Sequence, residues 1–449
     1  MQPEESAQPW EIGHLFAEVS HNGALPFAPA DGPAWAGRGV NARVSATARA
    51  RRGALRVRAA PLLWSAQNAP FTLVPTTGPF PFSDAALPRS IDLPQRHGDR
   101  SVTRLDAGES EIALEWTRAR IALTNAAVHL GPATDHSLVM QGDGGGFPRL
   151  EVGLPDVVRT PVGVFSAQVA WGRNPQTAWA PDRRRGALFS SYVVGTWRPR
   201  RSDRIELGVT RFFHRDWQNV SVRELFVPFG SIHTSRLIGG TVRADNQMGS
   251  IFARLRAPAA GLEFFGEYGK NDRSIDPRDQ VVETEHNAAW LLGFQRVWRG
   301  AGERLWVLNV TAVTGSISPI TTFRGQAFFY EHSSLTQGHT VRGQLLGTPL
   351  LQREGGGELR LDRYDARGRD GLVLRTRALP NERTLGVNPS LVRQEWSVLL
   401  ERLRWTSRGV VSARVGAVAD LGYSPVTGDA YSLHTGLGYA WGKVKTAQR

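Results

Sequence analysis

Reactive side chains are densest between residues 270 and 285, where acidic and basic groups lie close together. Paired carboxylates in such a stretch could be the acid and base of a glycosidase or ligands for calcium. The stretch lacks the D-x-D-x-D-G run of an EF-hand loop, and a solvated loop whose charges pair with one another is a simpler interpretation. Sugar binding is a third, because carboxylates and arginines form bidentate hydrogen bonds with hydroxyls and uronates. On this interpretation we predict polysaccharide-binding residues, namely Tyr268, Lys270, Asp272, Arg273, Asp276, Arg278 and Asp279.

Basic residues dominate the charge of the chain, which carries a formal net charge of +13 at pH 7. Two basic segments, 183–185 and 198–204, suit the phosphates of lipopolysaccharide or an acidic glycan. Solvated turns and a genome that favours arginine codons explain them equally well. We add Arg183, Arg184 and Arg185 to the predicted polysaccharide-binding residues. No basic helix, zinc-ligand spacing or aromatic RNA-binding signature accompanies the charge, so we expect no nucleic-acid partner.

Signals for catalysis are weak. The chain contains no cysteine, no G-x-S-x-G motif and no P-loop, and its histidines show no metal-ligand spacing. We therefore expect a protein that is not an enzyme and needs neither a metal nor another cofactor. The lack of cysteine also favours an exported protein over a cytosolic one.

Alternation of apolar and polar residues recurs along the chain and predicts the elements that position these groups. It marks strands near 40–51, 55–59, 111–116, 118–123, 163–173, 187–197, 205–211, 236–244, 250–257, 261–269, 287–298, 303–314, 325–331, 339–347, 357–364, 371–378, 393–405, 409–420 and 431–441. No apolar run is long enough for a transmembrane helix, but a transmembrane barrel needs only half-apolar strands. We predict an all-β fold, a large antiparallel transmembrane β-barrel of about 16–18 strands. The pattern alone also allows soluble β-sandwiches.

One face of several strands is charged. The arginines at 43, 49, 51, 56 and 58 alternate with small or apolar residues, and Glu263 and Glu267 alternate with Leu262, Phe264 and Tyr268 in the hairpin 261–298. In a barrel the charged face would line the lumen and the apolar face would meet lipid. The predicted lumen charge stripe is therefore Arg43, Arg49, Arg51, Arg56, Arg58, Glu263 and Glu267. These charges could line an open channel, but we favour a plugged lumen in which they are paired.

The two ends of the chain and one internal segment lack the alternation that marks the predicted strands. Residues 1–22 are predicted to be a polar segment over one end of the sheet, 23–441 the barrel, and 442–449 a basic tail. The proline-rich segment 68–100 cannot be a central strand, and it could be a periplasmic plug, a lumenal loop or an extracellular cover. The start, MQPEESAQPWEIGHLF, is not a signal peptide, so we expect that the natural start is misplaced or trimmed in this sequence.

Several segments carry a family likeness. They are AWAGRGVN at 34–41, IDLPQRHGD at 91–99, LGPATDHSLVMQGDGGGFPRLEVG at 130–153, RTPVGVFSAQVAWGR at 159–173, FFGEYGKNDRSIDPRD at 264–279, EHNAAWLLGFQR at 285–296, YEHSSLTQGHTVRGQLLG at 330–347 and the last strand with its turn. In these segments the chain resembles the Wzi family of capsule-assembly outer-membrane proteins. The resemblance implies an eighteen-stranded outer-membrane barrel and a surface lectin that helps to anchor or organise capsular polysaccharide.

Three function classes follow. The first is a non-enzymatic outer-membrane protein that binds capsular or extracellular polysaccharide, lies among outer-membrane lipid and lipopolysaccharide, and is a monomer. The second is a diffusion porin, which the arginine stripe favours. The third is an envelope hydrolase that uses the acidic loop, and it has the least support. Conductance, glycan binding and glycoside turnover would separate the three.

Overall fold

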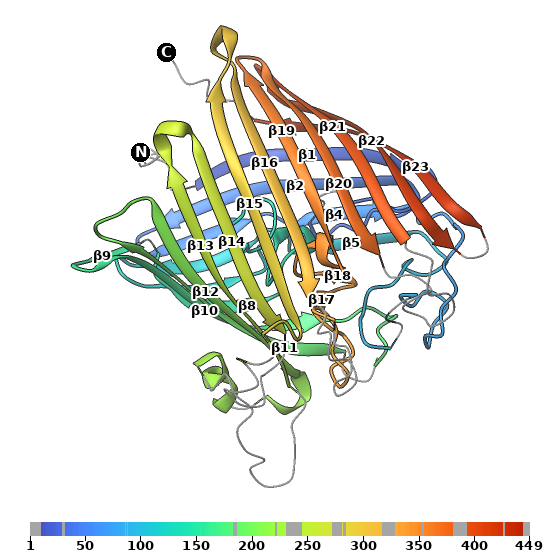
Figure 1. The fold of residues 1–449 in the computed structure, drawn as a ribbon, viewed down its shortest axis with the longest axis horizontal. Helices are drawn as coiled ribbons and strands as arrows, with labels where there is room; N and C mark the ends of the chain where they lie inside the picture. The colour runs from blue at the N-terminus through green and yellow to red at the C-terminus, as the bar shows by residue number, and fades with distance from the viewer. Residues whose placement is uncertain are drawn as a thin grey trace.

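The computed structural model describes residues 10–28, 32–85, 87, 89–155, 157–182, 186–220, 222–229, 245–271, 281, 284–316, 328–352, 354–379, 393–424 and 427–442. These residues form one large antiparallel sheet that curves round and closes on itself as a barrel (Figure 1). The predicted transmembrane-type β-barrel is confirmed, and it has 18 strands around its wall.

The wall strands are β1 (Trp10–Asn22), β2 (Gly39–Arg52), β3 (Leu55–Ala59), β4 (Leu62–Ala66), β5 (Val102–Asp106), β6 (Glu111–Glu115), β7 (Arg120–Thr124), β8 (Arg149–Gly153), β9 (Val158–Thr160), β10 (Gly163–Pro175), β11 (Ala187–Pro199), β12 (Ile205–Asp216), β13 (Asp245–Ala257), β14 (Leu262–Asn271), β15 (Ala288–Arg299), β16 (Leu305–Ser316), β19 (Gly355–Asp365), β20 (Gly368–Leu379), β21 (Arg393–Thr406), β22 (Gly409–Ser424) and β23 (Gly428–Trp441). Short 3-10 helices are η1 (Gly142–Gly144), η3 (Trp217–Asn219), η4 (Val222–Phe229), η5 (Pro258–Ala260), η6 (Ala301–Glu303) and η7 (Pro349–Leu351).

Three of the wall strands are interrupted, so the 21 strands of the sheet make an 18-stranded barrel. The strand β2 pairs with both β3 and β4, and β10 pairs with both β8 and β9, while β5 and β6 continue one another opposite β4 and β3. The break between β3 and β4 contains Pro61, which has no N–H to give to a ladder.

Closure of the barrel is made by the first and last wall strands. The strand β1 pairs with β2 on one side and with β23 on the other. Residues 10–22 therefore belong to the wall, and the prediction that 1–22 form a polar segment over one end of the sheet is wrong for them. The misprediction arose because Trp10–Asn22 contains a bulge between Ile12 and Leu15, which interrupts the period-two pattern.

The outer face of the wall is apolar. Large aliphatic side chains on many strands point away from the lumen and are exposed, such as Val19, Leu207, Ile251, Leu292, Leu400 and Leu437. Aromatic side chains lie near both rims, including the stacked pair Trp298 and Trp306 at the turn end and the pair Tyr268 and Trp290 at the loop end. An apolar band between aromatic rims matches the hydrocarbon core and interfaces of a bilayer.

Among the residues that the structure describes, no helix is both long and apolar enough to cross a membrane.

The two ends of the barrel differ. At one end the chain reverses in short turns, such as 53–54, 161–162, 366–367 and 407–408, and both ends of the wall, Trp10 and Trp441, lie there (Figure 1). At the opposite end most strands are joined by long segments, among them 67–101, 125–148, 217–244 and 317–354. We call these the turn end and the loop end.

Two predicted strands, 325–331 and 339–347, are not part of the wall. In the second, only Thr340–Val341 (β17) and Gln344–Leu345 (β18) pair, as a two-stranded hairpin separate from the barrel sheet. Residues 328–331 of the first contain no strand. Their described apolar residues Phe329, Tyr330, Val341 and Leu346 are buried, so these residues do not indicate a lipid-facing strand. The predicted strand 236–244 and the tail beyond residue 442 lie outside the described residues.

The hairpin 261–298 has the predicted orientation. Phe264 on β14 is 48% exposed on the outer face, whereas Glu267 is buried on the inner face. Glu263 also points inwards, where it pairs with Arg256. The alternation in the sequence thus assigned lipid and lumen faces correctly in this hairpin.

Candidate functional site

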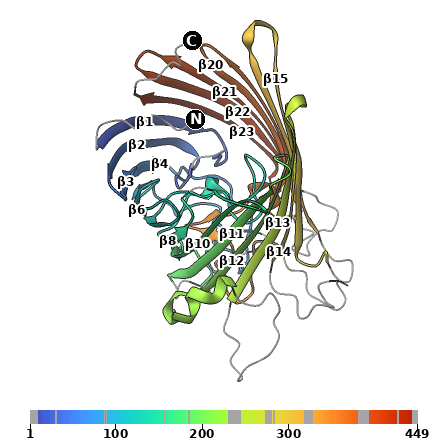
Figure 2. The ribbon, with the colours of Figure 1, turned by 90° about the vertical axis from the view of Figure 1, so that its left-hand side faces the viewer.

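Three of the long loop-end segments fold back into the lumen, and Figure 2 shows chain lying inside the curve of the wall. We call the described residues of 67–101, 125–148 and 328–352 the plug. Main-chain hydrogen bonds join its parts: Asp92 N donates to Gln337 O, Gln141 N to Leu346 O, and Thr348 N to Ser137 O. The proline-rich segment 68–100 therefore lies in the lumen, which was one of its three predicted places.

The plug has a hydrophobic core that continues into the wall. Apolar side chains of all three segments are buried against inward-facing residues of β11 to β16. The plug contributes Leu87, Ile91, Leu138, Met140, Phe147, Tyr330, Leu346 and Leu350, and the wall contributes Tyr192, Phe212, Met248, Leu291 and Val313. On the opposite side, Val74 and Ala85 pack on Tyr423 of β22. The plug therefore spans the lumen from one side of the wall to the other.

A histidine pair fastens the plug to β12. His339 Nε2 meets the carbonyl oxygen of Val139, which can only accept, so this nitrogen carries the proton. His339 Nδ1 then accepts from His214 Nε2 at 2.9 Å, and His214 Nδ1 accepts from the hydroxyl of Ser190 at 2.8 Å. With both imidazoles neutral, each ring nitrogen in this chain of hydrogen bonds has a partner.

Charged wall residues bind the plug at further points. Glu267 on β14 accepts a hydrogen bond from Leu138 N at 3.0 Å. Arg342 of the plug forms an ion pair with Asp106 at 2.5 Å. Within the loops, burial raises the pKa of Asp92 to about 6, although Thr177 donates to its carboxylate from both N and Oγ1.

Between the plug and the loop ends of β20, β21 and β22 lies a cleft with a volume of about 320 Å³. Plug and loop segments form one side of the cleft, through Leu25, Trp35, Phe71, Asp84, Gln95, Gln344 and Pro349. The wall forms the other, through Arg377, Arg393, Glu395, Asp420 and Tyr423. The cleft thus combines aromatic rings with planar charged groups.

Ion pairs hold the wall side of this cleft in place. Arg377 on β20 forms a bidentate pair with Glu395 on β21, with N–O distances of 2.8 and 2.9 Å. Arg393 forms a second bidentate pair with Asp420 on β22, at 2.9 and 2.6 Å, and its guanidinium lies 4.8 Å from the ring centre of Tyr423. All of these residues project from wall strands, so their positions are set by the barrel and not by loop conformation.

The plug side of the cleft is pinned by Gln95. Its Oε1 accepts from Val74 N at 2.9 Å, and its Nε2 donates to Val74 O and Ser83 O. The hydroxyl of Tyr423 donates to Thr72 O, which ties this segment to β22. Both sides of the cleft are therefore preorganised.

The predicted lumen charge stripe lines the inner wall, and several of its members are paired. Arg43 contacts Glu18 at 3.2 Å, and Arg56 contacts Glu115 at 2.7 Å. Arg49 and Arg51 lie on the inner face of β2 towards the turn end, where they are exposed. The inner wall thus carries ion pairs beside the plug and exposed arginines nearer the turn end.

Most of the predicted polysaccharide-binding residues lie outside the described part of the chain, namely Asp272, Arg273, Asp276, Arg278, Asp279, Arg183, Arg184 and Arg185. Tyr268 and Lys270 are described and lie on the outward face of β14. The Tyr268 ring packs on Trp290 with 4.5 Å between ring centres, and its hydroxyl donates to Thr284 O. These two residues lie on the barrel exterior, away from the cleft.

Sequence reasoning missed the cleft residues. A weak signal was present, because Arg375 and Arg377 alternate along 371–378 and Arg393 and Glu395 begin the strand 393–405. What the sequence did not show is that these strands lie beside the segment 68–100, which supplies the opposite side.

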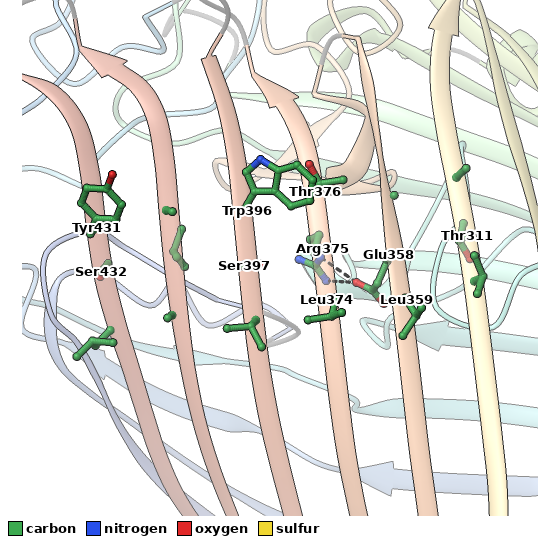
Figure 3. Close-up of a pocket in the computed structure, with 18 residues that line it drawn as sticks. Thr311, Glu358, Leu359, Leu374, Arg375, Thr376, Trp396, Ser397, Tyr431 and Ser432 are labelled. Carbon is green, nitrogen blue, oxygen red and sulfur yellow. Dashed lines mark hydrogen bonds and ion pairs between the residues drawn. The ribbon is translucent and has the colours of Figure 1, made fainter.

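Another hollow lies on the outside of the barrel and is almost wholly apolar (Figure 3). It lies over β16 to β23, with Leu359, Leu374, Trp396 and Leu433 in its lining. Behind this hollow, an ion pair between Arg375 on β20 and Glu358 on β19 joins the two strands. A hollow with this lining suits lipid acyl chains and not a polar ligand. Within the described residues, no cluster of histidine, aspartate or glutamate could hold a metal ion.

No family model and no curated protein matches the sequence. Among solved structures, the chain is similar to Wzi, an outer-membrane protein involved in group 1 capsule assembly in Escherichia coli and described as a carbohydrate-binding β-barrel. The identity is 13%, the TM-score is 0.60, and the match covers 95% of this chain and 84% of that chain.

Two further structures that match are porins or related barrels. A BenF-like porin from Pseudomonas fluorescens Pf-5 is 9% identical with a TM-score of 0.49, covering 96% of this chain and 98% of that one. OccAB2 from Acinetobacter baumannii is 9% identical with a TM-score of 0.48, covering 96% and 97%. At these identities, the similarity to Wzi shows the fold, a barrel of the outer-membrane type.

Proposed function

We propose that this chain is a non-enzymatic protein of the bacterial outer membrane that binds capsular or extracellular polysaccharide and anchors or organises it at the cell surface. The observation that carries the proposal is the cleft between the plug and the loop ends of β20 to β22. A membership of the Wzi family, which the sequence segments suggest, is part of this proposal. The fold similarity to a carbohydrate-binding β-barrel supports it.

The chemistry of the cleft suits a sugar. Vicinal hydroxyls can donate to the carboxylates of Glu395 and Asp420, and uronate or hydroxyl oxygens can accept from Arg377 and Arg393. The rings of Trp35, Phe71 and Tyr423 offer apolar faces for stacking. The volume lies at the lower end of the range for small-molecule sites, so the cleft would take a short segment of a longer chain.

The position of the cleft also fits a surface role. Short turns of outer-membrane barrels face the periplasm and long loops face the exterior. The cleft is at the loop end, because Arg377 is near the end of β20 and Arg393 begins β21. On this orientation the cleft opens towards the side where a capsule lies. The barrel closes within one chain, which is the basis for proposing a monomer surrounded by outer-membrane lipid and lipopolysaccharide.

The test replaces Arg393 by Gln and Asp420 by Asn together, which removes both charges and leaves a polar amide at each position. Polysaccharide from the producing strain should then bind at least about tenfold more weakly, because each lost charge-assisted hydrogen bond contributes about 1.5–3 kcal/mol. Binding is measured by calorimetry on the detergent-solubilised protein. Migration of unheated protein on a denaturing gel checks that the barrel is folded.

The matched control is the pair Arg360→Gln and Glu401→Gln. This pair also joins β19 and β21, with 2.6 Å between the charged atoms, but it lies towards the turn end and outside the cleft. The control should bind as the unmodified protein does. Equal binding by both double variants, with both folded, would remove the cleft as the polysaccharide site.

A diffusion porin is the alternative function, and the exposed Arg49 and Arg51 on the inner wall favour it. Planar-bilayer recording separates the two. The plugged lumen predicts small or transient currents, since the plug packs on opposite sides of the wall. A steady, large anion conductance of the unmodified protein would favour the porin.

A further inference from the structure

A charged cluster lies on the outer surface of the barrel, where most strands present apolar side chains. Its centre is Asp370 on β20. Arg363 on β19 contacts this carboxylate at 2.5 Å, Arg402 on β21 at 2.9 Å, and Arg404 on β21 at 2.8 Å. We call these four residues the rim cluster.

Strand register places the rim cluster on the outward face. Arg363 pairs with Asp370, and Asp370 pairs with Arg402, so the three lie in one row across neighbouring strands. Two residues further along β21 from Arg402, and on the same face, is Leu400, which is 56% exposed on the barrel exterior. The charges therefore face outwards and not into the lumen.

The depth of the rim cluster in the membrane follows from its neighbours. Arg363 pairs in register with Trp306, and Trp306 stacks on Trp298 with 6.1 Å between ring centres. Stacked tryptophans near the turn end mark the membrane interface. An arginine on the lipid face is costly at the bilayer midplane, but the cost becomes small near the interface. The cluster is thus at the level of lipid headgroups.

The charges of the rim cluster do not balance. Three guanidinium groups surround Asp370, and a second carboxylate, Asp365, lies 3.9 Å from Arg363. Arg402 is 63% exposed, so its guanidinium can reach a further anion. A surplus of positive charge at headgroup depth attracts a phosphate, which a guanidinium binds in a bidentate manner.

Beside the rim cluster is a groove of about 500 Å³ on the same outer surface. The residues lining it include Arg363, Asp370 and Arg402 at one end, and the apolar side chains of Leu361, Leu372, Leu400 and Val415. A phosphate at the arginines would place its acyl chains along these aliphatic side chains. The groove and the cluster together match the two parts of a membrane lipid.

We propose that the rim cluster and its groove bind one anionic glycerophospholipid, with the lipid phosphate on Arg402 and Arg404. The turn end faces the periplasmic leaflet, which distinguishes a glycerophospholipid from the lipid A of the opposite leaflet. This site is independent of the proposed polysaccharide binding, because it lies on the outer face of the wall at the turn end, whereas the cleft lies inside the wall at the loop end. It rests on the barrel being embedded in a bilayer.

The experiment offers phosphatidylglycerol to the full chain in detergent and counts bound lipid by native mass spectrometry. The unmodified protein should retain one lipid, and the double variant Arg402→Gln, Arg404→Gln should bind it at least about tenfold more weakly. The control is Arg299→Gln with Arg304→Gln, two exposed arginines at the same end that lie outside the groove. The control should bind as the unmodified protein does.

The variant Asp370→Asn separates lipid binding from a structural role of the cluster. Removal of the carboxylate increases the surplus positive charge, so binding of phosphatidylglycerol should be unchanged or tighter. Weaker binding by a folded Asp370→Asn protein would overturn the proposal, as would equal binding by the Arg402 and Arg404 variant. Displacement of phosphatidylglycerol by lipid A at equal concentration would overturn the choice of lipid.

Discussion

At the scale of single residues, the plug contains buried imidazoles whose burial favours the neutral form. His339 donates to Val139 O and accepts from His214, and a second proton on His339 would remove its acceptor. Burial lowers the pKa of His339 to about 4, although its hydrogen bond to Val139 opposes this shift. Burial likewise lowers the pKa of His97 and of His129 to about 4. Three plug histidines therefore resist protonation in the folded state.

Acidification should loosen the plug. In the unfolded state these histidines take up protons near pH 6.5, whereas in the folded state they do so only near pH 4. Their contribution to stability is thus present above about pH 6.5 and is lost as the pH falls towards 4, by up to about 1.4 kcal/mol per pH unit for each. Asp92, with a pKa raised to about 6, acts in the opposite direction. Protease cleavage within 328–352, followed from pH 7.5 to pH 5, should become faster.

The variant His339→Gln is the control for this effect. Glutamine cannot take up a proton, so the increase in cleavage between pH 7.5 and pH 5 should be smaller than in the unmodified protein. An identical pH profile for both proteins would show that His339 does not contribute to the pH response of the plug.

At the scale of the elements, some neighbouring strands pack closely because an aromatic ring on one strand lies over a glycine on the next. Phe252 on β13 lies opposite Gly208 on β12, and a Cβ atom at Gly208 would be 2.1 Å from the Phe252 ring. Phe265 on β14 covers Gly293 on β15 in the same manner, with a Cβ atom 2.6 Å from the ring. These glycines leave room for the rings on the inner face of the wall.

Replacement of Gly208 by Ala should therefore destabilise the pair of β12 and β13. The added methyl group would push Phe252 from its position, and overpacking of this kind costs about 1–3 kcal/mol. The expected result is a lower thermal midpoint of the gel-shift transition from folded to unfolded barrel. Gly195→Ala on β11 is the control, because its nearest non-adjacent atom would be 3.8 Å away. Equal midpoints for the two variants would refute the role of Gly208 in this close packing.

At the scale of the whole molecule, closure depends on an ion triad across the seam. Glu18 on β1 contacts Arg43 on β2 at 3.2 Å and Arg414 on β22 at 2.5 Å. It thereby joins strands from both ends of the chain, and its side chain is only 7% exposed. Glu18 is the shared acceptor of two arginines that would otherwise repel each other.

Replacement of Glu18 by Gln should weaken closure of the barrel. Two guanidinium groups would then face each other in a partly buried place, which we expect to cost about 2 kcal/mol after allowing for solvent screening. The measurement is the urea concentration at which the purified barrel unfolds in detergent. Glu11→Gln on the same strand, which is exposed, should leave this midpoint unchanged. A midpoint for Glu18→Gln equal to that of Glu11→Gln would contradict the role of the triad.

The sequence by itself determined a large antiparallel sheet, its approximate strand number and the two faces of the hairpin 261–298, whereas closure of the sheet is set by the pairing of β1 with β23. These features follow from period-two alternation, which is a local property of neighbouring residues. Because the alternation is a local pattern, it also led to wrong predictions for two plug segments and for the first wall strand. Apolar residues in 328–331 and 339–347 are buried in the plug and not in the wall, and the bulge in Trp10–Asn22 hid the first wall strand.

Only the tertiary structure decided where the long loops go and which charges meet. The cleft joins Gln95 to Arg377, Arg393 and Asp420, which lie far apart in the chain. Their proximity depends on the proline-rich segment turning into the lumen, because its buried apolar residues pack on the wall more favourably than in water. No local sequence pattern encodes this packing of the segment. The residues of the cleft could therefore be identified only from the tertiary structure.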